Sequence, residues 1–272
     1  MSGQVWAFVK SFVVPAPVAT ERPTANSQAG RYIRSFLIVR LMIGVLGVGW
    51  PLLLIFLDKW FYGGHPGSRI PRDSLSVYYY SGMREGFTVI LGVMAFFLLT
   101  YKLTERNLDN TLSFIAGIAG MTIPFFPTGR PDDISPPPAL NPLQNAIGEH
   151  GSQLVHFAAS AVFIGALGGV CLLFSRREGE RPDHGNRLPA RFWRTYHLLC
   201  AVAIGAAALW IIATTVGKSP LTDGPYWSLL LGEWVATWAF GFSWFAKGSE
   251  IRYLFGFDEP APAAAPAASP TG

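Results

Sequence analysis

The chain has 272 residues, of which 50% are hydrophobic and only 14% are charged, and its formal net charge is +4. Soluble domains carry about 25% charged residues, so this composition excludes an ordinary soluble enzyme, a disordered chain and a coiled coil. Nine Trp residues and a mean hydropathy of +0.32 are typical of a protein with two membrane interfaces. The composition therefore predicts an all-α integral membrane protein.

The two ends of the chain differ from its middle. Residues 1–34 contain an apolar run that is broken by Lys10 and has no basic segment before it, so we expect a cytoplasmic N-terminal arm rather than a signal peptide. Residues 256–272 form a Pro/Ala-rich tail whose composition predicts disorder. Residues 35–255 are expected to form one transmembrane domain.

A transmembrane helix needs about 20 mostly apolar residues, and six segments of the chain meet this requirement. In chain order they are residues 41–57, 83–101, 110–126, 151–174, 192–216 and 226–245. The first is bounded by Arg40 and Asp58, and the sixth contains one acid, Glu233. The sequence thus predicts a bundle of six transmembrane helices.

Lys and Arg are distributed unevenly between the two sides of these segments. Fifteen of the 21 basic residues fall on the side that holds the N-terminal arm, the loops after the second and fourth segments and the C-terminal tail. Five fall in the loops on the other side, and Arg84 lies at the mouth of the second segment. Because cytoplasmic loops carry the excess of Lys and Arg, both termini are predicted to be cytoplasmic.

Small residues four positions apart let helices approach closely in lipid, where no hydrophobic drive brings helices together. The third, fourth and fifth segments carry such rows, at Ala116 and Gly120, at Ala161, Gly165 and Gly169, and at Ala201 and Gly205. We expect these three helices to pack tightly. The two cysteines, Cys171 and Cys200, fall inside the fourth and fifth segments and are expected to be buried thiols.

Polar side chains gather at the predicted outer ends of three segments. They are Tyr78, Tyr79, Tyr80, Arg84 and Glu85 at the second segment, Glu149, Gln153, His156 and Ser160 at the fourth, and Glu233 about two turns into the sixth. The four residues of the fourth segment are spaced so that they share one helical face. Ionisable groups at this depth are costly, and their convergence predicts a polar pocket that opens outward.

Each of these residues also has a structural interpretation. The Tyr run is typical of an aromatic anchoring belt, Arg84 and Glu85 can cap a helix and reach lipid headgroups, and Glu233 can serve as a buried hydrogen-bonding residue that locks the bundle. Adjacent residues do not face each other on a helix, so Arg84 is expected to pair with Glu149 or Glu233. His156 needs a carboxylate, a carbonyl or a metal as its partner.

Metal and cofactor chemistry has little support in the sequence. His150 and His156 are six residues apart and point about 120° away from each other on an ideal helix, unlike the i, i+4 pair of a zinc hydrolase. His156, Glu149 and Glu233 form the remaining candidate ligand set, and no metal or cofactor is predicted. The sequence has no nucleophile elbow, no Gly-rich phosphate loop and no basic patch suited to nucleic acid.

Three stretches resemble a family of bacterial membrane proteins. They are Ser74-Leu-Ser-Val-Tyr-Tyr-Tyr-Ser-Gly-Met-Arg-Glu85, Phe125-Phe-Pro-Thr128, and the segment from Glu233 to Glu250. The pattern is similar to an uncharacterised bacterial family of six-span integral membrane proteins, distantly DRAM/Frag-like, over residues 35–255. Family members often carry Asp where Glu85 stands, which keeps the charge. The resemblance implies a multi-pass protein of the bacterial cytoplasmic (inner) membrane, and it implies no established activity.

Two functions remain after these exclusions. The first is binding of a lipid or small amphipathic ligand, or support of a membrane protein partner, through a pocket formed by Tyr78, Tyr79, Tyr80, Arg84, Glu85, Gln153, His156 and Glu233. The alternative is a membrane-embedded enzyme that acts on a lipid or terpenoid substrate. In that case His156 with Glu149 or Glu233 would perform acid–base chemistry. The sequence leaves the ligand and the reaction open.

Overall fold

The computed structural model describes residues 28–63, 69–101, 107–131, 137–179, 189–216 and 227–248, and these are helical with no strand among them. The helices are α2 (Gln28–Tyr62), the 3-10 helix η1 (Ser76–Tyr80), α3 (Arg84–Thr100), α4 (Leu108–Phe125), α5 (Pro142–Ile147), α6 (Glu149–Gly179), α7 (Ala190–Val216) and α8 (Ser228–Gly248). The all-α prediction is confirmed for this part of the chain. Residues 1–27 of the predicted arm and the predicted tail at 256–272 lie outside the described residues.

The six predicted segments each coincide with one long helix, and the first differs most. We expected the first helix near Leu41, whereas α2 begins at Gln28. Within the described residues, three helices are long and apolar enough to cross a membrane, namely those at Ser35–Phe61, Glu149–Glu178 and Ala190–Thr215. This finding supports the prediction of a membrane protein.

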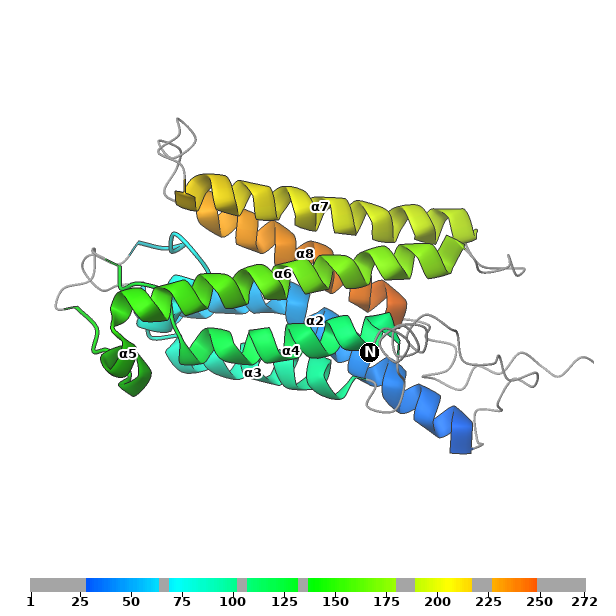
Figure 1. Cartoon of the computed structure of the whole chain (residues 1–272), viewed down its shortest axis with the longest axis horizontal. Coiled ribbons are helices and arrows are strands. Elements are labelled where there is room, and N and C mark those ends of the chain that lie inside the picture. The colour runs from blue at the N-terminus through cyan, green and yellow to red at the C-terminus, as the bar shows by residue number, and fades with distance from the viewer. Residues whose placement is uncertain are drawn as a thin grey trace, which may run out of the picture.

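The long helices run up and down the bundle in alternation (Figure 1). α2 ends, α3 begins and α4 ends at the end of the bundle that carries η1 and α5. α6 and α8 begin at this end and α7 finishes there. We call it the η1 end. Each helix therefore brings one terminus to the region where the polar residues of the sequence gather.

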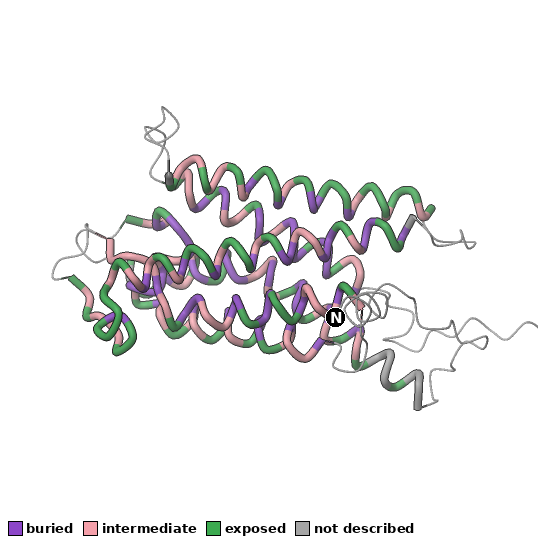
Figure 2. The backbone as a smooth tube through the Cα atoms, in the orientation of Figure 1, coloured by how far each residue is buried: buried purple, intermediate pink, exposed green. Residues whose placement is uncertain are grey.

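The surface and the interior of the bundle are both apolar. Figure 2 shows buried positions facing the inside of the bundle and exposed positions facing out. Large apolar side chains such as Phe56, Val89, Leu199 and Leu209 are at least 59% exposed. A soluble domain rarely presents so much apolar surface on every helix, and lipid is the solvent that suits it.

The tightest helix contact lies between α2 and α8 and was not predicted. A Cβ atom on Gly241 of α8 would lie 2.7 Å from the backbone nitrogen of Val48, and one on Gly44 of α2 would overlap the backbone of Phe245. α6 does pack against α4 and α7 as expected. The predicted rows on α6 and α7 are wrong in part, because Ala161 and Gly165 of α6 and Gly205 of α7 are exposed.

The helices at the opposite end of the bundle are tied together by ion pairs. Arg177 of α6 lies 2.5 Å from Asp109 of α4, and Lys247 of α8 pairs with Glu178 of α6. Cys171 and Cys200 are both free and buried, as predicted. The two cavities described below lie toward the η1 end and in the bundle next to it.

Candidate functional site at the η1 end

The segment before η1 is fixed to the start of α8. The Leu230 amide donates to the Asp73 carbonyl at 2.8 Å, and the Leu75 amide donates to a Glu233 carboxylate oxygen at 2.5 Å. Glu233 was predicted to lie two turns into its helix, and it does so on the inner face of α8. Its carboxylate therefore holds the backbone that immediately precedes Ser76.

His156 joins three separate parts of the chain. Its Nδ1 atom lies 2.9 Å from the carbonyl oxygen of Phe126, and its Nε2 atom lies 2.9 Å from Ser76 Oγ. A carbonyl oxygen can only accept, so Nδ1 carries the proton and donates it. In the neutral ring Nε2 then has a free lone pair that accepts the Ser76 hydroxyl proton. The predicted partner of His156 is thus a carbonyl, with a serine on the other side of the ring.

The segment that follows α4 lies along the first turns of α6. Ser152 Oγ donates to the Pro127 carbonyl at 2.9 Å, and the Glu149 carboxylate accepts from the backbone amide of Arg130 at 2.7 Å. The Arg130 guanidinium also forms an ion pair with Glu149 at 2.9 Å. This hydrogen bonding raises the pKa of Arg130. The fixed segment presents the Phe126 carbonyl to His156.

Three predicted pocket residues, Tyr78, Tyr79 and Tyr80, are buried in the packed interior and line neither of the two cavities described below. Tyr80 donates to the Thr128 carbonyl at 2.5 Å and accepts from Gln144 at 2.6 Å. Burial raises the pKa of Tyr80 to about 12. Aromatic side chains that are this well hydrogen-bonded support the walls of the site from behind.

Arg84 does not pair with Glu149 or Glu233, so that expectation is wrong. Its guanidinium lies 4.4 Å from the centre of the Tyr79 ring and donates to the Tyr79 hydroxyl at 2.6 Å. Both carboxylates are occupied by other donors, as described above. Glu85 is exposed at the start of α3. Neither Arg84 nor Glu85 lines the cavities described next.

A cavity of about 510 Å³ opens at the η1 end, and we call it the outer cavity. Gln153, His156 and Glu233 are the predicted pocket residues that line it. Residues of the wall that the sequence did not suggest include Arg69, Arg72, Asp73, Ser74, Ser76 and Arg130. Most of these belong to loops, where no periodicity indicates which way a side chain faces. Ser76 and Thr128 did lie inside the stretches that carry the family resemblance.

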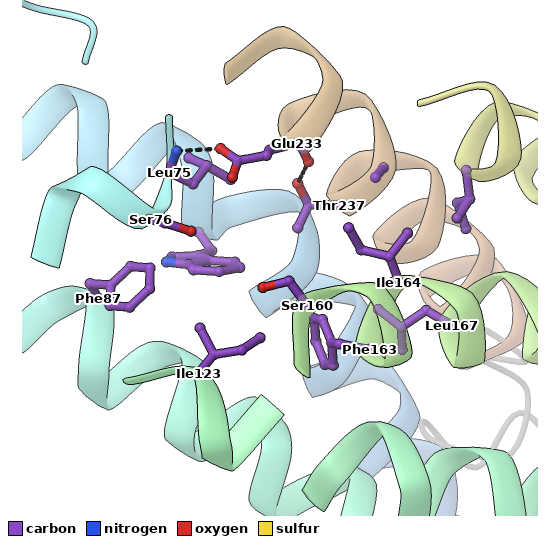
Figure 3. A pocket seen from close by; sticks show the side chains of 13 residues that line it. Leu75, Ser76, Phe87, Ile123, Ser160, Phe163, Ile164, Leu167, Glu233 and Thr237 are labelled. Carbon is purple, nitrogen blue, oxygen red and sulfur yellow. Dashed lines mark hydrogen bonds between the residues drawn. The ribbon is translucent and has the colours of Figure 1, made fainter. Parts of the chain in front are cut away.

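A smaller cavity of about 60 Å³, the inner cavity, continues into the bundle (Figure 3). Its walls are mostly apolar and include Phe87, Ile123, Phe163 and Leu167. The residues that line both cavities are Ser76, Ser160, Ile164 and Glu233. The two cavities are therefore neighbouring parts of one site, polar toward the η1 end and apolar inside.

One polar atom in the wall of the inner cavity has no partner. The Nε1 atom of Trp50 is buried and makes no hydrogen bond in the structure. A buried donor without an acceptor costs about 1–3 kcal/mol. Trp50 lines the inner cavity, but its Nε1 atom is itself almost completely buried.

The comparisons with known proteins add no family. The chain matches no protein-family model, and searches of curated proteins and of solved structures find no significant match. Among the described residues, no three His, Cys, Asp or Glu side chains are placed to hold a metal ion. The function must therefore be argued from the site itself.

Proposed function

We propose that the chain is a six-span protein of the bacterial cytoplasmic membrane and a member of the uncharacterised family that its motifs resemble. α3, α4 and α8 have 17, 18 and 21 residues, which is within the range of about 17–25 that crosses a bilayer. Apolar residues follow their outer faces, as at Val89, Val93 and Phe96 of α3. The excess of Lys and Arg favours cytoplasmic termini and an η1 end that faces outward.

Within this membrane domain, the site at the η1 end binds a lipid or small amphipathic ligand. The observation that carries the proposal is that a polar outer cavity lies next to an apolar inner one and shares four wall residues with it. Sites for small molecules usually have volumes of about 300–1,000 Å³ and a few fixed polar groups. The outer cavity has this volume. His156 and Glu233 are its fixed polar groups, and Gln153 adds a polar side chain to the wall.

The two cavities suggest how the ligand lies. A headgroup in the outer cavity meets the guanidinium groups of Arg69, Arg72 and Arg130. The first part of an apolar chain enters the inner cavity, which has room for only a few methylene groups.

Native mass spectrometry of the protein released from lipid nanodiscs tests the proposal by measuring the mass that stays bound. Ser160→Phe places a ring where the two cavities meet and should reduce the retained lipid. Ala161→Phe is the matched control, because the next residue on α6 faces outward and is exposed. Retention by Ser160→Phe at the wild-type level would refute the proposal. Wild-type protein that carries no bound mass would instead favour a membrane protein partner.

A further inference from the structure

Among the described residues, a serine contacts a histidine in two places, and the two pairs differ in their surroundings. His156 Nε2 lies 2.9 Å from Ser76 Oγ, and His197 Nδ1 lies 2.8 Å from Ser243 Oγ. His197 and Ser243 are at most 1% exposed and line neither cavity. Ser76 and His156 both line the outer cavity.

We propose that Ser76 is a nucleophile activated by His156, and that the site transfers or hydrolyses the acyl group of an ester lipid. A serine hydroxyl becomes nucleophilic when an adjacent base accepts its proton and a third group orients that base. Ser76, His156 and the Phe126 carbonyl form such a series, with 2.9 Å at each step. The inference rests on the proposed binding function, because it requires that the bound amphiphile contains an ester bond.

This chemistry requires the tautomer of His156 that carries its proton on Nδ1 and leaves a lone pair on Nε2. Nδ1–H is held by the Phe126 carbonyl, so the lone pair of Nε2 points at Ser76. The ring is 2% exposed and cannot turn without breaking both contacts. Glu233 positions the serine, because its carboxylate accepts from the backbone amide of the preceding residue, Leu75.

The inner cavity explains how an acyl carbonyl would be placed. Ser76 and Trp50 line the same cavity of about 60 Å³. An acyl carbonyl that enters this cavity would lie against the wall that contains Ser76. The acyl chain would then extend among the apolar residues of the cavity.

The reaction balances with water as the only co-reactant. Ser76 Oγ bonds to the acyl carbon while its proton moves to His156 Nε2. The bond between the acyl carbon and the alcohol oxygen breaks, and the alcohol leaves with the proton from Nε2. Water from the outer cavity then attacks the acyl-serine, His156 accepts its proton and returns it to Ser76 Oγ, and a carboxylic acid is released.

An alkyl fluorophosphonate tests this inference directly, because it bonds to the oxygen of an activated serine and loses fluoride. The protein in nanodiscs would be treated with ethyl and decyl fluorophosphonates, and the labelled peptide would be identified by mass spectrometry. We expect label on Ser76, no label on Ser76→Ala, and a labelling rate lowered about 100-fold or more by His156→Ala. Ser243→Ala removes the other Ser–His contact and should leave the labelling of Ser76 unchanged.

Several outcomes would overturn the inference. Wild-type protein that retains lipid but carries no label on Ser76 with either probe refutes the nucleophile and leaves the binding function intact. Labelling that persists in His156→Ala refutes the role of the histidine. Ser76→Cys covers the case in which His156→Ala fails to fold: its thiol should react with decyl iodoacetamide faster than that of Ser81→Cys, and equal rates refute activation at position 76. Protein that neither retains lipid nor accepts label refutes both proposals.

Discussion

The ion pair between Asp58 and Arg72 is the sharpest test of how the η1 end is held together. Asp58 lies near the end of α2, and Arg72 lies in the segment that leads to η1. The Arg72 Nε and Nη2 atoms lie 3.0 and 3.4 Å from the two Asp58 carboxylate oxygens. The two side chains are 8% and 0% exposed. Asp58→Ala therefore leaves a largely buried cation without its partner.

The expected loss follows from the burial of the remaining charge. Removing one partner of a buried ion pair costs about 3–5 kcal/mol, because the other charge stays desolvated. Arg72 also lines the outer cavity, where water can reach it, so we expect a loss near the lower value, about 3 kcal/mol. Adding Arg72→Met removes the orphaned charge and keeps the aliphatic stem. The double variant should therefore be more stable than Asp58→Ala alone.

Unfolding by SDS in mixed micelles, followed by Trp fluorescence, measures these free energies. Glu149→Ala is the matched control, because it breaks the Arg130–Glu149 ion pair at the same end, in which both side chains are 31% exposed. Exposed pairs contribute little to stability, so this variant should lose less than Asp58→Ala. Equal losses in the two single variants, or a double variant no more stable than Asp58→Ala, would refute the argument from burial.

Three further predictions use the same preparation. Burial raises the pKa of Tyr80 to about 12, above the unfolded value near 10. The folded state therefore binds the proton more tightly, and the free energy of unfolding should fall as pH rises from about 10 to about 12. Tyr80→Phe should flatten this part of a profile of unfolding free energy against pH. Gly44→Ala should lower the free energy of unfolding by about 1–3 kcal/mol, because the added methyl group overpacks against α8. Gly49→Ala should not lower it, because the Cβ position of Gly49 has open space around it. Unfolding in SDS measures both variants. Cys171 and Cys200 should react with maleimide only after unfolding, because both thiols are buried, and rapid labelling of the folded protein would contradict this.

The helices could be predicted from the sequence because apolar length is a local property. The start of α2 could not be predicted in this way, because it depends on contacts of the helix with residues elsewhere in the chain. Arg40 was taken as the charged boundary of the first segment, yet it is only 7% exposed. Its guanidinium lies 4.4 Å from the Phe36 ring and donates to the Tyr101 hydroxyl. A cation that is stacked on rings and hydrogen-bonded can lie inside a helix bundle, so its charge did not mark an end.

The sequence predicted at which level of the bundle the site residues lie, but not which way their side chains face. Positions counted from the helix ends placed His156 and Glu233 at the same level, and both line the outer cavity. The three tyrosines lay at that level too, but the 3-10 turn at η1 rotates them into the interior. Ser76 and His156 are 80 residues apart, and no spacing rule connects residues of two different helices at that separation. Such pairs are found only from tertiary structure.

The charges around the outer cavity lead to a last prediction about the ligand. Arg72 and Arg130 would favour an anionic headgroup if their charges were free. Arg72 is already paired with Asp58, however, and Arg130 with Glu149. Arg69 and Asp73 line the same cavity with opposite charges, so the local charge is nearly balanced. The attraction for an anionic headgroup should therefore be weak, and burial of the apolar chain should dominate binding.

Lipid competition measures this balance. Nanodiscs that contain equal amounts of phosphatidylglycerol and phosphatidylcholine should yield protein that retains both, with less than about a tenfold preference. The ratio should change little between low and high salt, because paired guanidinium groups have little free charge to screen. Glu149→Gln leaves Arg130 without its carboxylate and should shift retention toward phosphatidylglycerol. A strong, salt-sensitive preference in the wild type would show that the guanidinium groups, and not the apolar cavity, select the ligand.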